Sequence, residues 1–523
     1  MKLQDIKPML LLLLTLTVAL TSCNKFLDVP PPGKLTFEQF WKNREQAVAA
    51  IAGIYSNSGS TSWDFTTTGN LSERDMSPVE AYIYWGEMRG DLLASVAGRL
   101  NSLQQNKENI DNLLVTPGDV TTKYTDFYKI INQANQAIKN IPNIITLDPS
   151  FSKTEADQLV AEAYFLRAHA YFWLVRTFKE VPLVLEPSET DNQDYQIAKS
   201  SNENLLKQII ADLTFAKANL PEWYDNSQYP RCRATKFTAA TVLADVYLWQ
   251  AATSSAANTA ELYDKAISNC DEVINSGRYA LLPGASYGSL FLMGNTVESI
   301  FEIYSNSLLN NQTNRLQDWF GSIFLVPAAT DALFTDYTQP DYRGFTPPAG
   351  PVPVRGNIVS YNPSNRFIQK YNNTTRDARW IYYRYPEVLL MKAEAIAHRY
   401  PDDAARLETA CELVNQVRSR AYGVEDYVQI TSSSTLEMDR ILIDERAREF
   451  IGEGKRWFDL MRFASRDNFA HKELLIDRVV NSFPSTLQLV INPRVNNPES
   501  WYLPLNATAL NANQKLVQNP YYQ

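Results

Sequence analysis

Apolar residues recur every three or four positions over most of this chain, which is the spacing of one face of an α-helix. Between residues 122 and 141, for example, Tyr124, Tyr128, Ile131 and Ala134 follow this period. The same spacing predicts further helices over 36–55, 154–178, 202–219, 236–253, 259–276, 383–399, 403–421 and 435–464. The pattern therefore predicts a mainly α protein.

The segment 154–178 is apolar on more than one face, which is typical of a deeply packed helix, and Thr154 stands where an N-cap is expected. Two predicted helix pairs also look alike. VLADVYLWQA (242–251) precedes 266–274, and VLLMKAEAIA (388–397) precedes 410–418. Small residues let the helices of each pair approach closely: Ala244, Ala266, Ala393 and Ala410. This pattern favours a tetratricopeptide-like scaffold of stacked helical hairpins.

Two long segments, 56–120 and 280–380, lack helical periodicity. The second contains the strand-like alternation SIFEIY (299–304) and a proline-rich stretch at 346–354. We expect a large loop-rich, partly β insertion region within a single helical domain covering 36–523. The Asn- and Pro-rich tail, 484–523, is expected to be extended.

The N-terminus predicts a lipoprotein. Lys2 and Lys7 precede the apolar run MLLLLLTLTVAL (9–20). As a helix this run would be about 18 Å long, too short for a bilayer core of about 30 Å, so it is typical of a signal peptide. The following Leu-Thr-Ser-Cys resembles a bacterial lipobox. We therefore expect residues 1–22 to be a signal peptide, Cys23 to be acylated, and 23–35 to form a stiff proline-containing spacer. Ordinary secretion is the alternative.

Composition and charge then exclude several classes of function. A net charge of −9 disfavours nucleic-acid binding, which needs a basic surface. The three histidines, His169, His398 and His471, lie far apart, so we predict no metal centre and no cofactor. The cysteines beyond Cys23 have wide spacings and read as small buried side chains: Cys232, Cys270 and Cys411.

Two groups of carboxylates invite an enzymatic interpretation. Glu445, Glu449 and Glu453 share one helical face, but the many neighbouring arginines predict a network of ion pairs. Glu298 and Glu302 would lie about 13 Å apart on a strand, too far for the carboxylate pair of a glycosidase. We therefore predict no catalytic residues.

Aromatic residues in the predicted loops are better candidates for chemistry. A flat ring can cover the apolar face of a sugar while polar neighbours bond its hydroxyl edge. Candidate ligand-binding residues of this kind are Trp319, Trp63, Trp85, Arg89, Asp91, Tyr304 and Asn306. The alternative for each is a role in the core or in anchoring a loop.

Several motifs together resemble the SusD/RagB family of surface lipoproteins. They include CNKFLDVPPP (23–32), AEAYFLRAHAYFWLVRTFKEVPLV (161–184), YYRYPEVLLMKAEAIA (382–397), DERAREFIGEGKRWFDLMR (444–462) and QNPYY (518–522). Each is weak alone, but their order along the chain is specific. One departure is Lys179-Glu180, where the family usually has a glycine.

The resemblance implies a non-enzymatic nutrient-binding protein at the outer-membrane surface, held to lipid through acylated Cys23. It further implies a tetratricopeptide-like fold and a SusC-like TonB-dependent barrel as partner, into which glycan ligands pass. Three alternatives stay open at this point: peptide capture of the RagB type, a surface glycoside hydrolase, and a purely structural helical-repeat scaffold.

Overall fold

The computed structural model describes residues 40–59, 76–95, 109–190, 192–225, 230–254, 258–305, 315–327, 330, 333–334, 341–346, 359–360, 367–372, 377–423 and 429–523. The signal peptide, Cys23, the spacer and two candidate site residues, Trp63 and Asn306, lie outside these ranges. Within the described ranges, none of the helices combines the length and the apolar character that crossing a bilayer requires.

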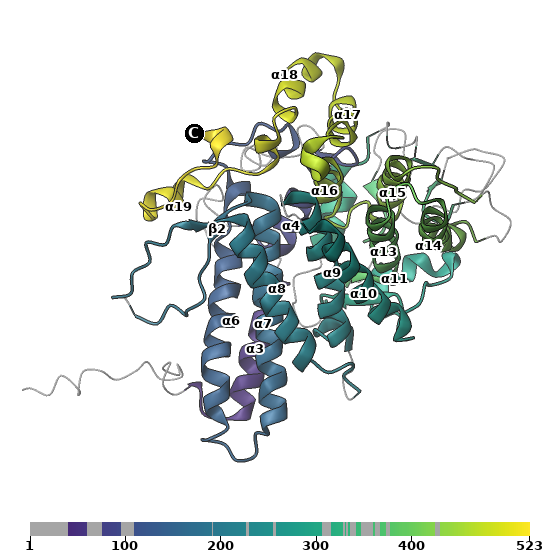
Figure 1. The fold of residues 1–523 in the computed structure, drawn as a ribbon. Helices are drawn as coiled ribbons and strands as arrows, with labels where there is room; N and C mark the ends of the chain where they lie inside the picture. The colour runs from purple at the N-terminus through teal and green to yellow at the C-terminus, as the bar shows by residue number, and fades with distance from the viewer. Residues whose placement is uncertain are drawn as a thin grey trace, which may run out of the picture.

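The scaffold is a continuous array of antiparallel helices in which each helix packs against the next (Figure 1). Its members are α3 (Arg44–Ser58), α6 (Thr125–Ile144), α7 (Lys153–Phe178), α8 (Asn202–Asn219), α9 (Lys236–Thr253), α10 (Thr259–Asn275), α13 (Tyr385–Arg399) and α14 (Ala404–Tyr422). The mainly α, tetratricopeptide-like scaffold predicted from the sequence is confirmed.

The two similar hairpins are α9–α10 and α13–α14, as the sequence predicted. All four small residues expected at the helix contacts, Ala244, Ala266, Ala393 and Ala410, are fully buried. Helix α10 packs directly against α13, although about a hundred residues separate them in sequence. The described part of the intervening segment therefore does not interrupt the array.

Local signals at the ends of α7 explain its limits. Ser152, and not Thr154 as predicted, is the N-cap, because its backbone is extended and its hydroxyl accepts a hydrogen bond from the Glu155 N–H at 3.2 Å. At the other end Lys179 has a φ of 68°, in the left-handed region that favours glycine. This is the position where the sequence departs from the family pattern.

The helix predicted over 435–464 is in fact two helices, α15 (Thr435–Phe450) and α16 (Arg456–Phe469). Gly452 and Gly454 lie between them with φ values of 80° and 73°, which end one helix before the next begins. The prediction missed this break because the apolar spacing continues through the turn.

Helix α4 (Pro78–Gly86) lies within the segment 56–120 that was expected to be irregular. All nine of its residues are buried, so it has no polar face and therefore no visible period. Its end meets the turn between α15 and α16 very closely. A Cβ atom on Gly86 would lie 1.9 Å from the carbonyl oxygen of Gly454, so only glycine fits there.

The expectation of an extended tail over 484–523 is wrong. After α17 (Glu473–Ser482) the tail contains α18 (Ser485–Val495), η10 (Pro498–Trp501), α19 (Ala507–Ala512) and η11 (Pro520–Tyr522). Its prolines and asparagines begin these short helices rather than prevent them; Asn506, for instance, caps α19 through the Thr508 N–H. The tail also covers the end of α7, where the Leu503 N–H donates to the Thr177 carbonyl oxygen at 2.8 Å.

Short strands form three small sheets in the described residues. β4 (Ser299–Glu302) pairs with β9 (Ile381–Arg384), which confirms the strand predicted near 299–304. β2 (Val181–Pro182) pairs with β3 (Lys199–Ser200). The third sheet has the order β1 (Ala94–Ser95), β5 (Phe324–Leu325), β8 (Phe367–Ile368), β7 (Val359–Ser360) and β6 (Phe345–Thr346). It joins the two irregular segments of the sequence, because Ala94 pairs with Leu325.

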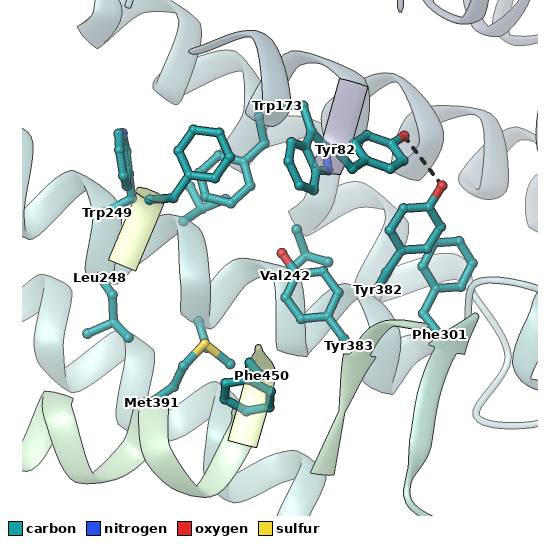
Figure 2. Close-up of a cluster of buried hydrophobic side chains, with 14 of the residues drawn as sticks. Tyr82, Trp173, Val242, Leu248, Trp249, Phe301, Tyr382, Tyr383, Met391 and Phe450 are labelled. Atoms are coloured by element: carbon teal, nitrogen blue, oxygen red, sulfur yellow. Dashed lines mark hydrogen bonds between the residues drawn. The ribbon is translucent and has the colours of Figure 1, made fainter. Parts of the chain in front are cut away.

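An aromatic core connects the helices to the β4–β9 sheet (Figure 2). The rings of Tyr82 and Trp173 lie 4.2 Å apart, Phe301 stacks on Tyr382 at 5.0 Å, and the Tyr382 hydroxyl bonds to the Tyr82 hydroxyl at 3.3 Å. His169 lies in the same core, where burial lowers its pKa to about 3. It is therefore a neutral, packed histidine.

Candidate functional site

The cluster of charged residues at the end of α15 is a buried ion-pair network. Arg384, at the end of β9, is fully buried and contacts three carboxylates. Its guanidinium lies 2.8 Å from Glu298 and 2.9 Å from Glu453, and it also pairs with Glu449. Further cations bind the same carboxylates and their neighbour Glu445: Arg343, Lys370 and Arg420.

This arrangement confirms the interpretation of the cluster as ion pairs. Burial opposes ionisation of Glu445, but Arg343, Arg448 and Arg418 hold its pKa at about 2. The pKa of Glu449 is likewise held well below its usual value by Arg420, Arg384 and Arg343, despite burial. These carboxylates are therefore charged and paired, and they link β9, α14 and α15 rather than offer a proton to a substrate.

Stacked aromatic rings lead from the five-stranded sheet toward the core. Phe324 contacts Phe320, Phe320 stacks on Tyr371 at 4.8 Å, and Tyr371 stacks on Trp380 at 6.1 Å. The Tyr371 hydroxyl donates to the Gly452 carbonyl oxygen at 2.9 Å. The loop-rich region is therefore fixed on the helical scaffold by a continuous set of buried contacts.

Three of the candidate site residues lie in or just after α4; Trp85 and Arg89 are buried, and Asp91 is half-buried. The Trp85 ring is 1% exposed, and its Nε1–H donates to the Thr121 carbonyl oxygen at 2.7 Å. Arg89 donates to the Trp501 and Ser500 carbonyl oxygens and lies 4.1 Å above the Trp457 ring. Asp91 pairs with Arg456 at 2.6 Å. These contacts give Arg89 and Asp91 roles in holding the C-terminal segments, and Trp85 a role in packing against the turn at Thr121.

The other two described candidates lie on different elements. Trp319 begins the π-helical turn η8 (Trp319–Ile323), and at 3% exposure it belongs to the core. Tyr304 follows β4 and is half-buried, with the Arg379 guanidinium 4.5 Å from its ring centre. Strand β1, which follows Asp91, pairs with β5, which follows Trp319. Tyr304 instead follows β4 of the β4–β9 sheet.

A more accessible group of side chains lies beside Trp319. The Gln317 amide donates to Asn372 Oδ1 at 3.1 Å, and the Asn372 amide donates to Gln369 Oε1 at 2.7 Å. Leu325 and Phe367 are cross-strand partners on β5 and β8, and both are half-buried, whereas their neighbours Phe324 and Ile368 face the core. We call these five residues (Gln317, Leu325, Phe367, Gln369 and Asn372) the amide patch.

The amide patch is not among the candidates predicted from the sequence, because those were grouped around tryptophan and tyrosine rings and its ring is a phenylalanine. Phe367 and Gln369 are two positions apart, the spacing that places strand side chains on one face. That spacing was the available signal. The pairing of β5 with β8, which brings Gln317 to the same place, has no local signature in the sequence.

Two family models match the chain, and together they cover most of it. The model described as "Starch-binding associating with outer membrane" matches residues 25–248, and the model described as "SusD family" matches residues 303–522. The chain belongs to the SusD family.

Relatives and solved structures of this family are similar to this chain over part or most of its length. SusD-like protein P2 of Formosa agariphila is 28% identical over 493 residues, covering 86% of this chain and 89% of the relative. A SusD-like protein of Bacteroides ovatus is 26% identical over 248 residues, covering 46% and 39%. The crystal structure of a SusD superfamily protein from Bacteroides fragilis superposes with a TM-score of 0.70 at 19% identity, covering 92% of this chain and 100% of the other. Such a likeness shows the shared fold.

Proposed function

We propose that this SusD-family protein binds neutral oligosaccharides at the cell surface and does not cleave them. The observation that carries the proposal is the amide patch, where half-exposed apolar side chains lie beside three connected amides. A sugar ring has an apolar face of C–H groups and an edge of hydroxyl groups. Phe367 and Leu325 suit the face, and the amides can both donate to and accept from the edge.

Gln317 adds a specific reason to expect a ligand at the amide patch. Its Oε1 atom is buried and has no hydrogen-bond partner within the described part of the chain. A buried acceptor without a partner costs free energy, which a ligand hydroxyl would recover if the amide turned toward the surface. In this proposal Trp85, Arg89, Asp91 and Trp319 hold the structure around them in place rather than contact the ligand. Trp63, Tyr304 and Asn306 stay proposed ligand contacts.

We propose no catalytic residues. Glu298, the carboxylate that the hydrolase alternative would need most, is fully buried and bound to both Arg384 and Arg420. Burial raises the pKa of Glu302, but its carboxyl is also inside the protein, where it accepts from the Asn295 N–H. Neither group has the exposure that a glycoside hydrolase needs at its bond-cleaving pair.

The proposal extends to the membrane and to a partner. Acyl chains on Cys23 would hold the protein to outer-membrane lipid, and the prolines of the 23–35 spacer would keep its body close to the surface. Binding alone moves nothing across a membrane, so import requires a pore. A SusC-like TonB-dependent barrel that receives the glycan is the partner we propose. Peptide capture of the RagB type is the second candidate.

Removal of the amide patch tests the binding site. The double variant Gln317→Ala, Asn372→Ala should bind its best glycan about tenfold or more weakly, because two hydrogen-bonding amides are lost at roughly 1 kcal/mol each. Calorimetric titration against a panel of neutral oligosaccharides, beginning with starch-derived chains, measures this. The matched control is Asn57→Ala, Gln133→Ala, which removes an exposed amide–amide hydrogen bond between α3 and α6. Equal affinities for the two double variants would place the site elsewhere.

A further inference from the structure

A second groove lies apart from the amide patch, on the outer side of α14. It has a volume of about 780 Å³ and is open to solvent. Ligand sites commonly have volumes of roughly 300–1,000 Å³, so this groove is large enough for a chain of sugar rings. Its lining includes Leu281, Leu282, Gln416, Ser419, Arg420 and Gln429.

One wall of the groove is held in place by Asn415. Its side-chain amide donates to the Ile430 carbonyl oxygen at 3.1 Å, and its Oδ1 accepts from the Ile430 N–H at 3.0 Å. These two hydrogen bonds fix the segment 429–430 against α14. Gln429 and Gln416 both border the groove, and both are exposed. The other wall is aliphatic, formed by Leu281 and Leu282, which are half-buried.

Arg420 borders the groove but brings little free charge to it. The residue is 8% exposed, and its terminal nitrogens are held by Glu298 and Glu449 of the buried network. Its Nε–H has no acceptor among the residues that the structure describes. Because two carboxylates already neutralise the guanidinium and its Nε atom is itself buried, the group offers little attraction to an anion.

We propose that this groove is a second binding site for a neutral oligosaccharide, separate from the amide patch. Its lining combines an aliphatic wall, the exposed amides of Gln416 and Gln429, and the Ser419 hydroxyl. Among the described lining residues, the charged ones are Arg420 and Glu412. The negative charge of Glu412 disfavours acidic ligands. Two separate sites would let one glycan chain, or two, be held with greater avidity than one site gives.

The variant Gln416→Ala, Gln429→Ala tests the second site. Both side chains are exposed, so the fold should be unaffected, and the melting temperature checks this. Against the same panel of neutral oligosaccharides, the native protein should bind with a stoichiometry of two, and this variant with a stoichiometry of one or with at least fivefold weaker affinity. The Asn57→Ala, Gln133→Ala protein should behave as native.

The outcomes separate this proposal from the proposed function. Binding that is lost in the amide-patch variant but unchanged in the groove variant would overturn the second site and leave the proposed function standing. The groove could instead bind peptides. If the native protein bound peptides but not sugars, and the groove variant bound those peptides more weakly, the assignment of the groove to a sugar would be overturned. Failure of the native protein to bind any neutral glycan of the panel would overturn both.

Discussion

Replacement of Arg384 by methionine is expected to lower the free energy of unfolding by about 3–5 kcal/mol. Arg384 is 0% exposed and faces Glu298, Glu449 and Glu453. Loss of its charge leaves three buried carboxylates with fewer partners, and a buried charge without compensation is costly. Urea denaturation followed by circular dichroism measures the change in unfolding free energy.

The matched control is Lys153→Met, which breaks the exposed pair of Lys153 with Asp157 at 2.5 Å on α7. Exposed pairs are screened by water, so this change should be nearly neutral. If Arg384→Met were as stable as the control, the network would contribute nothing to stability. The link that it makes between β9, α14 and α15 would then need another explanation.

Cys23→Ser is expected to move the protein from the membrane fraction to the soluble fraction almost completely. Each buried CH₂ of an acyl chain contributes about 0.8 kcal/mol to membrane binding, so loss of all acyl chains removes the whole anchor. Fractionation of cells that lack the proposed partner barrel, with mass spectrometry of the N-terminal peptide, measures the distribution and the lipid.

The control for that experiment is Cys232→Ser. This cysteine is half-buried, and burial raises the pKa of its thiol, so the thiol is unreactive. Cys232→Ser should remain in the membrane fraction. A Cys23→Ser protein that sediments with membranes as firmly as its parent would show that the lipobox interpretation is wrong.

The helical scaffold could be predicted because its signals are local. The helices α8 and α9 begin and end where the apolar period and the caps Ser201 and Thr235 place them. Helix α4 escaped prediction because burial on every side removes the period that marks a helix. The break between α15 and α16 depends on Gly452 and Gly454, which have positive φ values, and a Cβ on Gly454 would lie 2.8 Å from the carbonyl oxygen of Tyr82 on α4.

The candidate site was harder to predict because burial is a property of the fold. Trp85 and Trp319 stand among turn residues in the sequence, as a ligand-binding aromatic would, yet the structure buries both. The Trp85 Nε1–H bonds to Thr121, and Phe320, the residue after Trp319, stacks on Tyr371; both partners lie far away in sequence. The ion-pair network was predictable in kind, since arginines and glutamates crowd one helix, but its central residue Arg384 comes from β9.

The most direct test of the central proposal is a single calorimetric titration of the purified protein with neutral oligosaccharides, followed by chromatography of each mixture after prolonged incubation. We expect at least one glycan to bind with a defined stoichiometry and to be recovered at its original length. Recovery of shortened glycans, with their formation abolished by a single Glu or Asp substitution, would contradict the proposal by making the protein a hydrolase. A complete lack of binding, together with binding of peptides, would contradict it in favour of peptide capture.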